Sequence, residues 1–495
     1  MLRRLPARLA LFVLLAGALA PGGEAPSSVP IPTPWPHGAA PSSAELDRLL
    51  EDANGIEERE RLEEFLAAGE INEDSDHLAI TQEDVDANVY DKALIFQFGD
   101  EFFAHEFTRE NGYGDSSFKT LKRVHAGVRG GLDTFSCAGC HSLGGPDGAG
   151  SPTQNSMIQG DGDHAGSALV RNPPALLGLG MVQALGAEMS QELRFQRQTA
   201  LDKAKSSGQA VTLDLMTKGI SFGTLVIQPN ADIDYAALDG VDFDLVIKPF
   251  GRKGTISRLR RFVEDAARVH FGEQSHVLAL GYKDKPDMPH LGPGPNWYDP
   301  DNDGRQRELE EGILTCVATY LAMLEVPVVL PPADPGLRER WASGSALFDA
   351  VGCSACHVRQ IPLLYTTWHE IADTTPGDVV IDLFADGDRP RGTNLVEVFS
   401  DFKRHDLGPG LADPHDEEHK LPRSVFLTRP LWGLAETPPY LHDGRAATIP
   451  AAILAHGGDA QPQRDAFAAL SPDEQADLHV FLLSLTREPK VRVAR

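Results

Sequence analysis

Cysteine is scarce in this chain of 495 residues, and its few occurrences follow a pattern. Four of the five cysteines lie in two Cys-x-x-Cys-His units, CAGCH and CSACH, which argues against the disulfide framework typical of small exported domains. The fifth, Cys316, lies in the apolar run LTCVATYLAML, and we predict that it is a buried core thiol.

Long apolar runs are also missing, because no stretch of the chain is apolar for long enough to span a bilayer comfortably. The opening MLRRLPARLALFVLLAGALAPGGEAP places arginines before a short apolar stretch and ends in small residues, which is the layout of a cleavable secretory signal. No cysteine precedes Cys137, which argues against a lipoprotein. We therefore expect a signal peptide at 1–24 and a periplasmic mature protein; a retained anchor is the alternative.

Positive charge is in deficit, since 45 Lys and Arg face 72 Asp and Glu, for a formal net charge of −27. Such a surface repels nucleic acid and anionic membranes and favours a basic protein partner. A surface that is acidic only for solubility is the alternative. The hydrophobic content of 41% argues against disorder, and the length suits two or three domains.

The two Cys-x-x-Cys-His units are the strongest chemical signal in the sequence. They are formed by Cys137, Cys140 and His141, and by Cys353, Cys356 and His357. Two cysteines one turn apart can each form a thioether with a haem vinyl group, and the following histidine can bind the iron. A zinc site or a thioredoxin-like redox pair does not explain the histidine after the second cysteine in both units. We therefore predict two covalently attached haems c.

The domain organisation follows from these units and from the composition between them. We predict a mainly α fold with two cytochrome c-like haem domains and an inserted mixed α/β segment in the first. The insertion combines a helical part, ELRFQRQTALDKAK, with the strand-like runs TLVIQ and FDLVIKPF. The predicted parts are a signal peptide at 1–24, a Pro-rich linker at 25–43, the first haem domain at 44–325 with the insertion at about 188–286, a linker at 326–336, and the second haem domain at 337–495.

Several ordered motifs show a resemblance to a known family. CAGCH is followed by RNPPALLGLG, and the last third contains SDFKRHDLGPGLAD, TRPLWGL and PPYLHDGRAATIPAAILAHGGDA. Together they resemble the di-haem oxidoreductase branch of the bacterial di-haem cytochrome c peroxidase superfamily, which includes the tunnelling oxidase of methylamine utilisation. The resemblance implies a peroxidatic N-terminal haem, a C-terminal haem that transfers electrons, a small electron-donor protein such as a basic cytochrome, and calcium between the haems.

The resemblance also implies individual roles around the first haem. His164 precedes Asn172 and would be the distal ligand of the iron at His141. Asn172 matches a calcium ligand, which the backbone carbonyls of Thr428 and Pro430 would complete, because a hard cation prefers oxygen ligands. The alternative for Asn172 is a turn residue before two prolines.

A carboxylate near the peroxidatic iron is expected to move a proton between the two peroxide oxygens. Gln183 and Glu188, in MVQALGAEM, are the nearest catalytic candidates. The family pattern has an acidic residue where Gln183 stands, so the sequence departs from it there. Polarity on a helix surface is the alternative for both residues.

For the second iron, we expect a sixth ligand other than methionine. In the peroxidase archetype this ligand is a methionine, which raises the potential, but no methionine follows Met323 here. The resemblance places His456 at this position, and a core or capping histidine is the alternative. Arg429 and Arg445 are candidate partners of the haem propionates, whereas we expect structural roles for two further histidines, His405 and His442.

A second calcium site is suggested by YDPDNDGRQRELE. Asp299, Asp301, Asp303 and Glu310 match the spacing of a calcium loop, and Gly304 allows its sharp turn. The alternative is an acidic turn that caps the following helix.

The function expected from these observations is reduction of hydrogen peroxide. Two other functions remain open: electron transfer without peroxidase turnover, with both irons capped by two strong ligands, and tunnelling oxidation of a protein partner.

Haem stoichiometry provides the first test. The mature protein should retain two haems through acid-acetone extraction, because thioether bonds survive it. Replacing Cys137 and Cys140 together should remove one haem, and replacing Cys353 and Cys356 together should remove the other, as measured by pyridine haemochrome absorbance. Finding a single haem in the intact protein would contradict the prediction.

Overall fold

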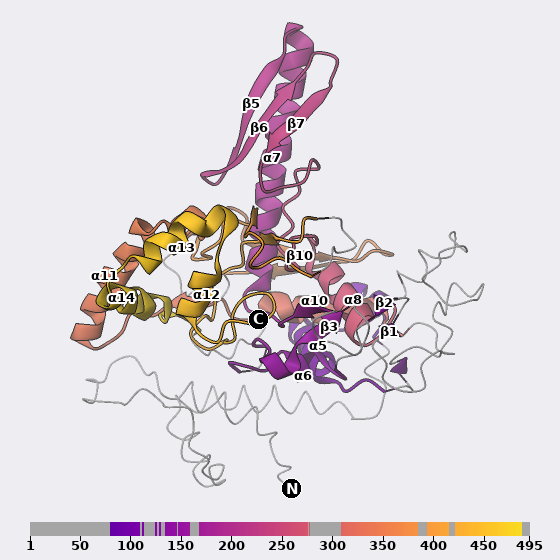
Figure 1. Cartoon of the computed structure of the whole chain (residues 1–495). Helices are drawn as coiled ribbons and strands as arrows, with labels where there is room; N and C mark the ends of the chain where they lie inside the picture. The colour runs from indigo at the N-terminus through magenta and orange to yellow at the C-terminus, as the bar shows by residue number, and fades with distance from the viewer. Residues whose placement is uncertain are drawn as a thin grey trace, which may run out of the picture. The chain divides into compact units, whose positions relative to one another are not determined.

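The computed structural model describes residues 80–108, 111–112, 124–125, 128–129, 134–145, 147–158, 168–275, 277, 308–384, 394–414 and 421–487 (Figure 1). They belong to one compact unit, Leu78–Arg487. The predicted signal peptide, the linker at 25–43, His164 and the aspartates of the predicted calcium loop lie outside the described residues. Among the described helices, none combines the length and the apolar character that crossing a membrane requires.

Helix α10 (Glu311–Met323) is the core of the N-terminal part, because it is buried from Glu311 to Ala322. It packs against α4 (Gln82–Asp86), α5 (Lys92–Ala104) and α8 (Leu259–His270). A β-carbon at Gly99 would collide with the carbonyl of Cys316, so α5 and α10 approach each other closely. Cys316 is 1% exposed, which confirms the buried core thiol.

The first Cys-x-x-Cys-His unit lies among short elements. These are β1 (Val124–His125), β2 (Val128–Arg129), α6 (Cys137–Cys140), η3 (Pro152–Gln154), β3 (Ser156–Ile158) and β4 (Leu169–Arg171). Strand β1 pairs with β2, and β3 pairs with β4, both antiparallel.

The predicted insertion contains a long helix and a three-stranded sheet. Helix α7 (Leu179–Ser207) runs beside an antiparallel sheet of β5 (Val211–Thr217), β6 (Ile220–Ile227) and β7 (Ile233–Leu238), in that order (Figure 1). A strand expected over FDLVIKPF is wrong. Leu245, Ile247 and Phe250 are buried there, but the backbone N–H of Ile247 donates to the hydroxyl of Ser190 on α7 instead of to a neighbouring strand.

The C-terminal part alternates helices with short strands. Its elements are β8 (Val328–Val329), α11 (Pro335–Ala350), η5 (Cys353–Ala355), β9 (Ile361–Pro362), β10 (Thr367–Ile371), β11 (Asp378–Asp382), β12 (Leu395–Val396), β13 (Arg404–Asp406), β14 (Val425–Leu427), α12 (Ile449–Ala455), η6 (Gly458–Ala460), α13 (Gln461–Ala468), α14 (Pro472–Leu482) and β15 (Leu485–Thr486). Its hydrophobic core contains Phe348 from α11, Phe481 from α14, and Phe399, which lies between β12 and β13. The capping box predicted from Ser471 and Glu474 is confirmed at the start of α14.

The expectation of a mainly α fold is wrong, because about 39% of the chain is helical and 18% is strand. Most of the strands form two-stranded sheets, and several pair segments that are distant in sequence. Strand β8, inside the predicted linker at 326–336, pairs with β15, and β9 pairs with β12. Strands of two or three residues have no periodicity of their own, and only their distant partners define them.

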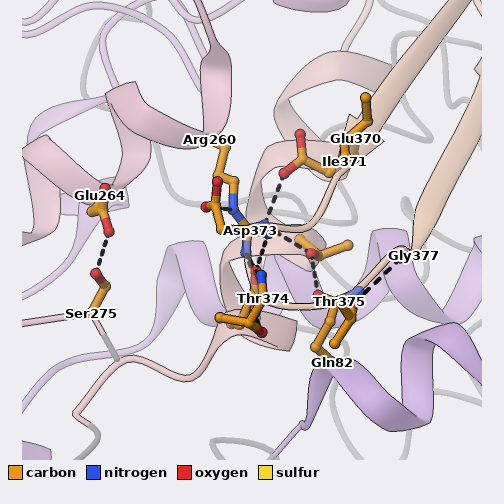
Figure 2. Close-up of polar contacts among 12 residues, drawn as sticks. Gln82, Arg260, Glu264, Ser275, Glu370, Ile371, Asp373, Thr374, Thr375 and Gly377 are labelled. Atoms are coloured by element: carbon orange, nitrogen blue, oxygen red, sulfur yellow. Dashed lines mark hydrogen bonds and ion pairs between the residues drawn. The ribbon is translucent and has the colours of Figure 1, made fainter. Parts of the chain in front are cut away.

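A buried charge network joins α8, α10 and the segment from β10 onward (Figure 2). The guanidinium of Arg260 is fully buried and lies 2.8 Å from Glu311, 2.9 Å from Glu370 and 2.9 Å from Asp373. Burial raises the pKa of Glu370 to about 7, although the charge of Arg260 opposes this rise. Glu311 and Glu370 depend on this cation, because a buried charge without a partner is costly. Asp373, by contrast, also pairs with Arg258 and Arg261.

Replacing Arg260 tests how much this network contributes to stability. Arg260→Met should lower the free energy of unfolding by about 3–5 kcal/mol, because it leaves buried carboxylates without their partner. Arg261→Met is the matched control: Arg261 also pairs with Asp373 but is 39% exposed, and should cost at most about 1 kcal/mol. Thermal unfolding followed by circular dichroism measures both variants, and equal losses would contradict the prediction.

Candidate functional site

A single cavity of about 650 Å³ is lined by both Cys-x-x-Cys-His units. Cys137, Cys140 and His141 line it from the N-terminal part, and Cys353, Cys356 and His357 line it from the C-terminal part. All five cysteines of the chain are free thiols. The structure therefore brings the two predicted haem attachment sites together around one space.

The first unit is held by a short helix and two carbonyls. The hydroxyl of Ser136 caps α6 by accepting a hydrogen bond from the Gly139 amide at 3.1 Å. Nδ1 of His141 lies 2.9 Å from the carbonyl oxygen of Pro174 and 3.2 Å from that of Gly148. Burial lowers the pKa of His141 to about 4, so the ring is neutral. Because Nδ1 donates its proton to a carbonyl, Nε2 keeps the lone pair that a metal needs.

The second unit repeats this arrangement. Nδ1 of His357 lies 3.0 Å from the carbonyl oxygen of Phe399. Burial lowers the pKa of His357 to about 4 as well. Both histidines are therefore neutral rings with a fixed tautomer, and each follows two free thiols. This donor set fits two haems c bound through thioethers and histidine.

The cavity also contains a cation suited to haem propionates. Among the described residues, the guanidinium of Arg429 forms no hydrogen bond or ion pair, although it lines the cavity and burial lowers its pKa to about 10. Arg445, the other predicted propionate partner, does not line the cavity. It is 43% exposed and bonds with Asp443 and with the carbonyl of Gly410.

Five further cations of the described chain line the cavity: Arg171, which begins the RNPPALLGLG motif, and Arg252, Lys253, Arg268 and Arg464, which no sequence motif indicates. Lys253 is 2% exposed and donates to the carbonyls of Pro422 and Arg423. It belongs to the segment between the sheet and α8, which has no resemblance to the family motifs. Only the folded chain brings these charges to the cavity.

His456, the predicted sixth ligand of the second iron, lines the same cavity as His357. Its Nδ1 lies 2.8 Å from the carbonyl oxygen of Ala452, and burial lowers its pKa. His456 follows α12 directly, as its C-cap residue. The tautomer again leaves Nε2 available, so the geometry fits the predicted role.

His405 and His442 are held by carboxylates. Nε2 of His405 lies 2.8 Å from Asp401. Burial alone would lower the pKa of His405, but its hydrogen bonds with Asp401 and Cys356 raise it to about 10. Ligand atoms of His405, Asp401 and Cys356 lie within 4.8 Å of one another, but a thioether at Cys356 would occupy that sulfur. The ring of His442 stacks on Phe426 at 4.3 Å.

The two predicted catalytic residues lie outside the cavity lining. Glu188 is 5% exposed and pairs with the ammonium of Lys218 at 2.8 Å, and it also accepts the amide N–H of Leu364 at 2.8 Å. Gln183 accepts the amide N–H of Leu259 at 2.6 Å. Both side chains attach other elements to α7, so the geometry offers no support for a catalytic role.

Acid–base groups reach the cavity from α8 instead. Asp265 and His270 both line it, and Nδ1 of His270 lies 3.4 Å from the hydroxyl of Ser156. The helix has a polar face with no motif, which explains why the sequence did not indicate these residues.

The first set of predicted calcium ligands also lines the cavity: Asn172, Thr428 and Pro430. The side-chain N–H of Asn172 donates to Asn155 at 2.7 Å, and the carbonyl of Thr428 accepts the hydroxyl of Ser400 at 2.7 Å. The calcium role stays a prediction. Of the second set, Glu310 is the N-cap residue of α10, and Asp299, Asp301 and Asp303 lie outside the described residues.

Comparison with solved structures gives only weak similarity. The chain aligns with hydrazine synthase of Kuenenia stuttgartiensis, pressurized with xenon, at 21% identity over 38% of this chain and 59% of that chain, with a TM-score of 0.24. It therefore spans less than two thirds of that protein's length. It also aligns with a MauG-like protein associated with microbial copper homeostasis at 15% identity, over 53% of this chain and 79% of that one, with a TM-score of 0.27. Both scores are too low to indicate a shared overall fold.

Comparison with curated proteins gives no match. Residues 303–485, however, match the model of the family described as "Di-haem oxidoreductase, putative peroxidase". The match includes the second Cys-x-x-Cys-His unit, Arg429 and His456. The resemblance seen in the sequence is thereby confirmed for this C-terminal part of the chain, which is similar to the di-haem oxidoreductase family.

Proposed function

We propose that this chain is a periplasmic di-haem c-type enzyme that reduces hydrogen peroxide with electrons from a small donor protein. The observation that carries the proposal is the single cavity lined by both Cys-x-x-Cys-His units. Reduction of peroxide to two molecules of water needs two electrons and two protons. Two irons held around one cavity can store the two electrons, so that no one-electron product has to be released.

Different residues of the chain would bind the irons, neutralise the haem propionates and transfer protons. His141 and His357 would hold the two irons through Nε2, and Arg429 would neutralise a propionate. When bound, the haems supply electron storage and an iron at which peroxide can react. Asp265 and His270 are the groups on α8 that can move protons inside the cavity.

The donor and the location follow from the charge and the leader sequence. A net charge of −27 attracts a basic protein, such as a small cationic cytochrome. The signal-like start of the chain supports a periplasmic location, where such donors can reach it.

Electron transfer without peroxide turnover is the second candidate. It is favoured by the position of Glu188, which lies outside the cavity lining and is used in an ion pair with Lys218. If His164 and His456 cap the two irons permanently, no site for peroxide exists.

The ligand of the second iron can be tested directly. We expect His357 and His456 to coordinate it, which gives a lower potential than a histidine and methionine pair. His456→Ala should convert this haem from low spin to high spin, as seen by electron paramagnetic resonance. A sulfur-to-iron charge-transfer band in the wild-type protein, or an unchanged spectrum in the variant, would contradict the assignment.

Turnover decides between the two functions. The protein should consume peroxide after reduction of one haem, because His164 would then leave the iron at His141. His164→Ala should be active without that reduction. The measurement is peroxide consumption with a small cytochrome or an artificial donor. If the half-reduced wild-type protein stays six-coordinate and consumes no peroxide, the electron-transfer function holds.

A further inference from the structure

We propose that Tyr320 is a one-electron redox site that exchanges an electron with the haem held at His141 and transfers its phenolic proton to Asp147. The inference rests on the proposed function, since oxidation of that haem by peroxide supplies the oxidant. It assigns a role to a buried pair that lies outside the cavity.

The hydrogen bond of Tyr320 sets up the proton transfer. Tyr320 lies on α10 and is 3% exposed, and its hydroxyl donates to Oδ1 of Asp147 at 2.7 Å. Loss of an electron makes a phenol strongly acidic, so the proton has to move to an acceptor within hydrogen-bond reach. The buried carboxylate of Asp147 is such an acceptor, and the side chain of Asp100 is a second hydrogen-bond partner of the same hydroxyl.

An aromatic contact connects Tyr320 with the first haem site. The ring of Phe103 lies 5.6 Å from the ring of Tyr320 and 6.2 Å from the ring of His141, centroid to centroid. Phe103 lines the cavity and Tyr320 does not. Tyr320 is thus one aromatic ring away from the iron ligand, which is close enough for electron tunnelling and too far to bind iron.

The surroundings of Asp147 make it a proton acceptor near neutral pH. Burial raises the pKa of Asp147 to about 7, against the hydrogen bond from Tyr320, which lowers it. Asp100 and Glu325 also raise this pKa, and Arg487 lowers it. A carboxylate with a pKa of about 7 holds a proton from the tyrosine more readily than an exposed aspartate.

The reaction balances as a single exchange. The O–H bond of Tyr320 breaks, an O–H bond forms on Asp147, and one electron reduces the oxidised haem. The products are a neutral tyrosyl radical and a protonated Asp147. An electron from the donor protein, together with the return of the proton, restores the starting pair.

A structural role is the alternative, because the hydroxyl of a buried tyrosine normally finds a hydrogen-bond partner. Tyr440 is the matched control for it. Tyr440 lines the cavity, and its hydroxyl donates to the carbonyl oxygen of Leu434 at 2.8 Å. A backbone carbonyl cannot take the proton, so Tyr440 lacks the acceptor that Tyr320 has.

The experiment mixes the half-reduced holoprotein, in which the iron at His141 is expected to be open to peroxide, with hydrogen peroxide and freezes it for electron paramagnetic resonance. We expect a tyrosyl signal in the wild type and in Tyr440→Phe, and its loss in Tyr320→Phe. Asp147→Asn retains the tyrosine without its buried acceptor and should diminish the signal, although Asp100, a second hydrogen-bond partner of the hydroxyl, is still present. Haem content and the visible spectrum check that each variant is folded. An undiminished signal in Tyr320→Phe, or in folded Asp147→Asn, overturns the proposal.

A second oxidant separates this proposal from the proposed function. If peroxide leaves the haem spectrum unchanged, the proposed peroxidase function is wrong. In that case, light-activated ruthenium tris(bipyridine) replaces peroxide as a one-electron oxidant in the same experiment. The same dependence on Tyr320 and Asp147 is expected, with a radical yield that falls as pH drops below about 7, where Asp147 is protonated. No radical from the wild type with either oxidant overturns the role of Tyr320.

Discussion

The hydrogen bond from histidine Nδ1 to a backbone carbonyl is the interaction on which the site depends. It occurs at both Cys-x-x-Cys-His units, from His141 to Pro174 and from His357 to Phe399. In each case the carbonyl comes from a segment more than thirty residues away, as the separations of 33 and 42 positions show. The tautomer of the imidazole, and with it the ability to bind iron, is therefore set by tertiary structure. A motif of five residues cannot do this alone.

Hydrogen bonds to backbone carbonyls join the segments around the first Cys-x-x-Cys-His unit to segments of the C-terminal part. The amide N–H of Asn172 donates to the carbonyl of His442 at 2.8 Å. A β-carbon at Gly444, whose φ is +70°, would lie 2.9 Å from the side-chain nitrogen of Asn172, so the turn in HDGR needs glycine there. Arg487 donates to the carbonyl of Gly144, which ties the end of the described chain to the loop after the first unit. These contacts hold both units around one cavity.

The sequence was most informative where a function requires particular residues in a local pattern. Both Cys-x-x-Cys-His units, the buried Cys316 and the capping box of α14 were predictable because each depends on neighbours in the chain. The short strands were not, since β8 and β15 are defined only by their pairing. FDLVIKPF shows that buried apolar residues need not form a strand: the backbone N–H of Ile247 donates to Ser190 of α7, and Phe250 forms an isolated β-bridge with nearby Ile256.

The roles of charged residues were the hardest to predict from the sequence, because each role depends on the residues with which the charge pairs in the folded chain. Glu188 has a carboxylate, as a catalytic acid requires, but this carboxylate forms an ion pair with the ammonium of Lys218 at 2.8 Å. Arg445 bonds with Asp443 instead of entering the cavity. In the described part of the chain, the cavity is lined by six cations, Arg171, Arg252, Lys253, Arg268, Arg429 and Arg464, and by two acids, Asp265 and Asp459.

The cationic lining contrasts with a protein of net charge −27. Burial in a medium of low dielectric strengthens the attraction between these cations and any anion that enters the cavity. Haem propionates are such anions, and Arg429 has no partner among the described residues. Peroxide is neutral, so the same charges do not oppose its entry. The acidic exterior therefore suits the proposed basic donor while the cationic interior suits the proposed haem propionates, because the two fields act on different ligands in different places.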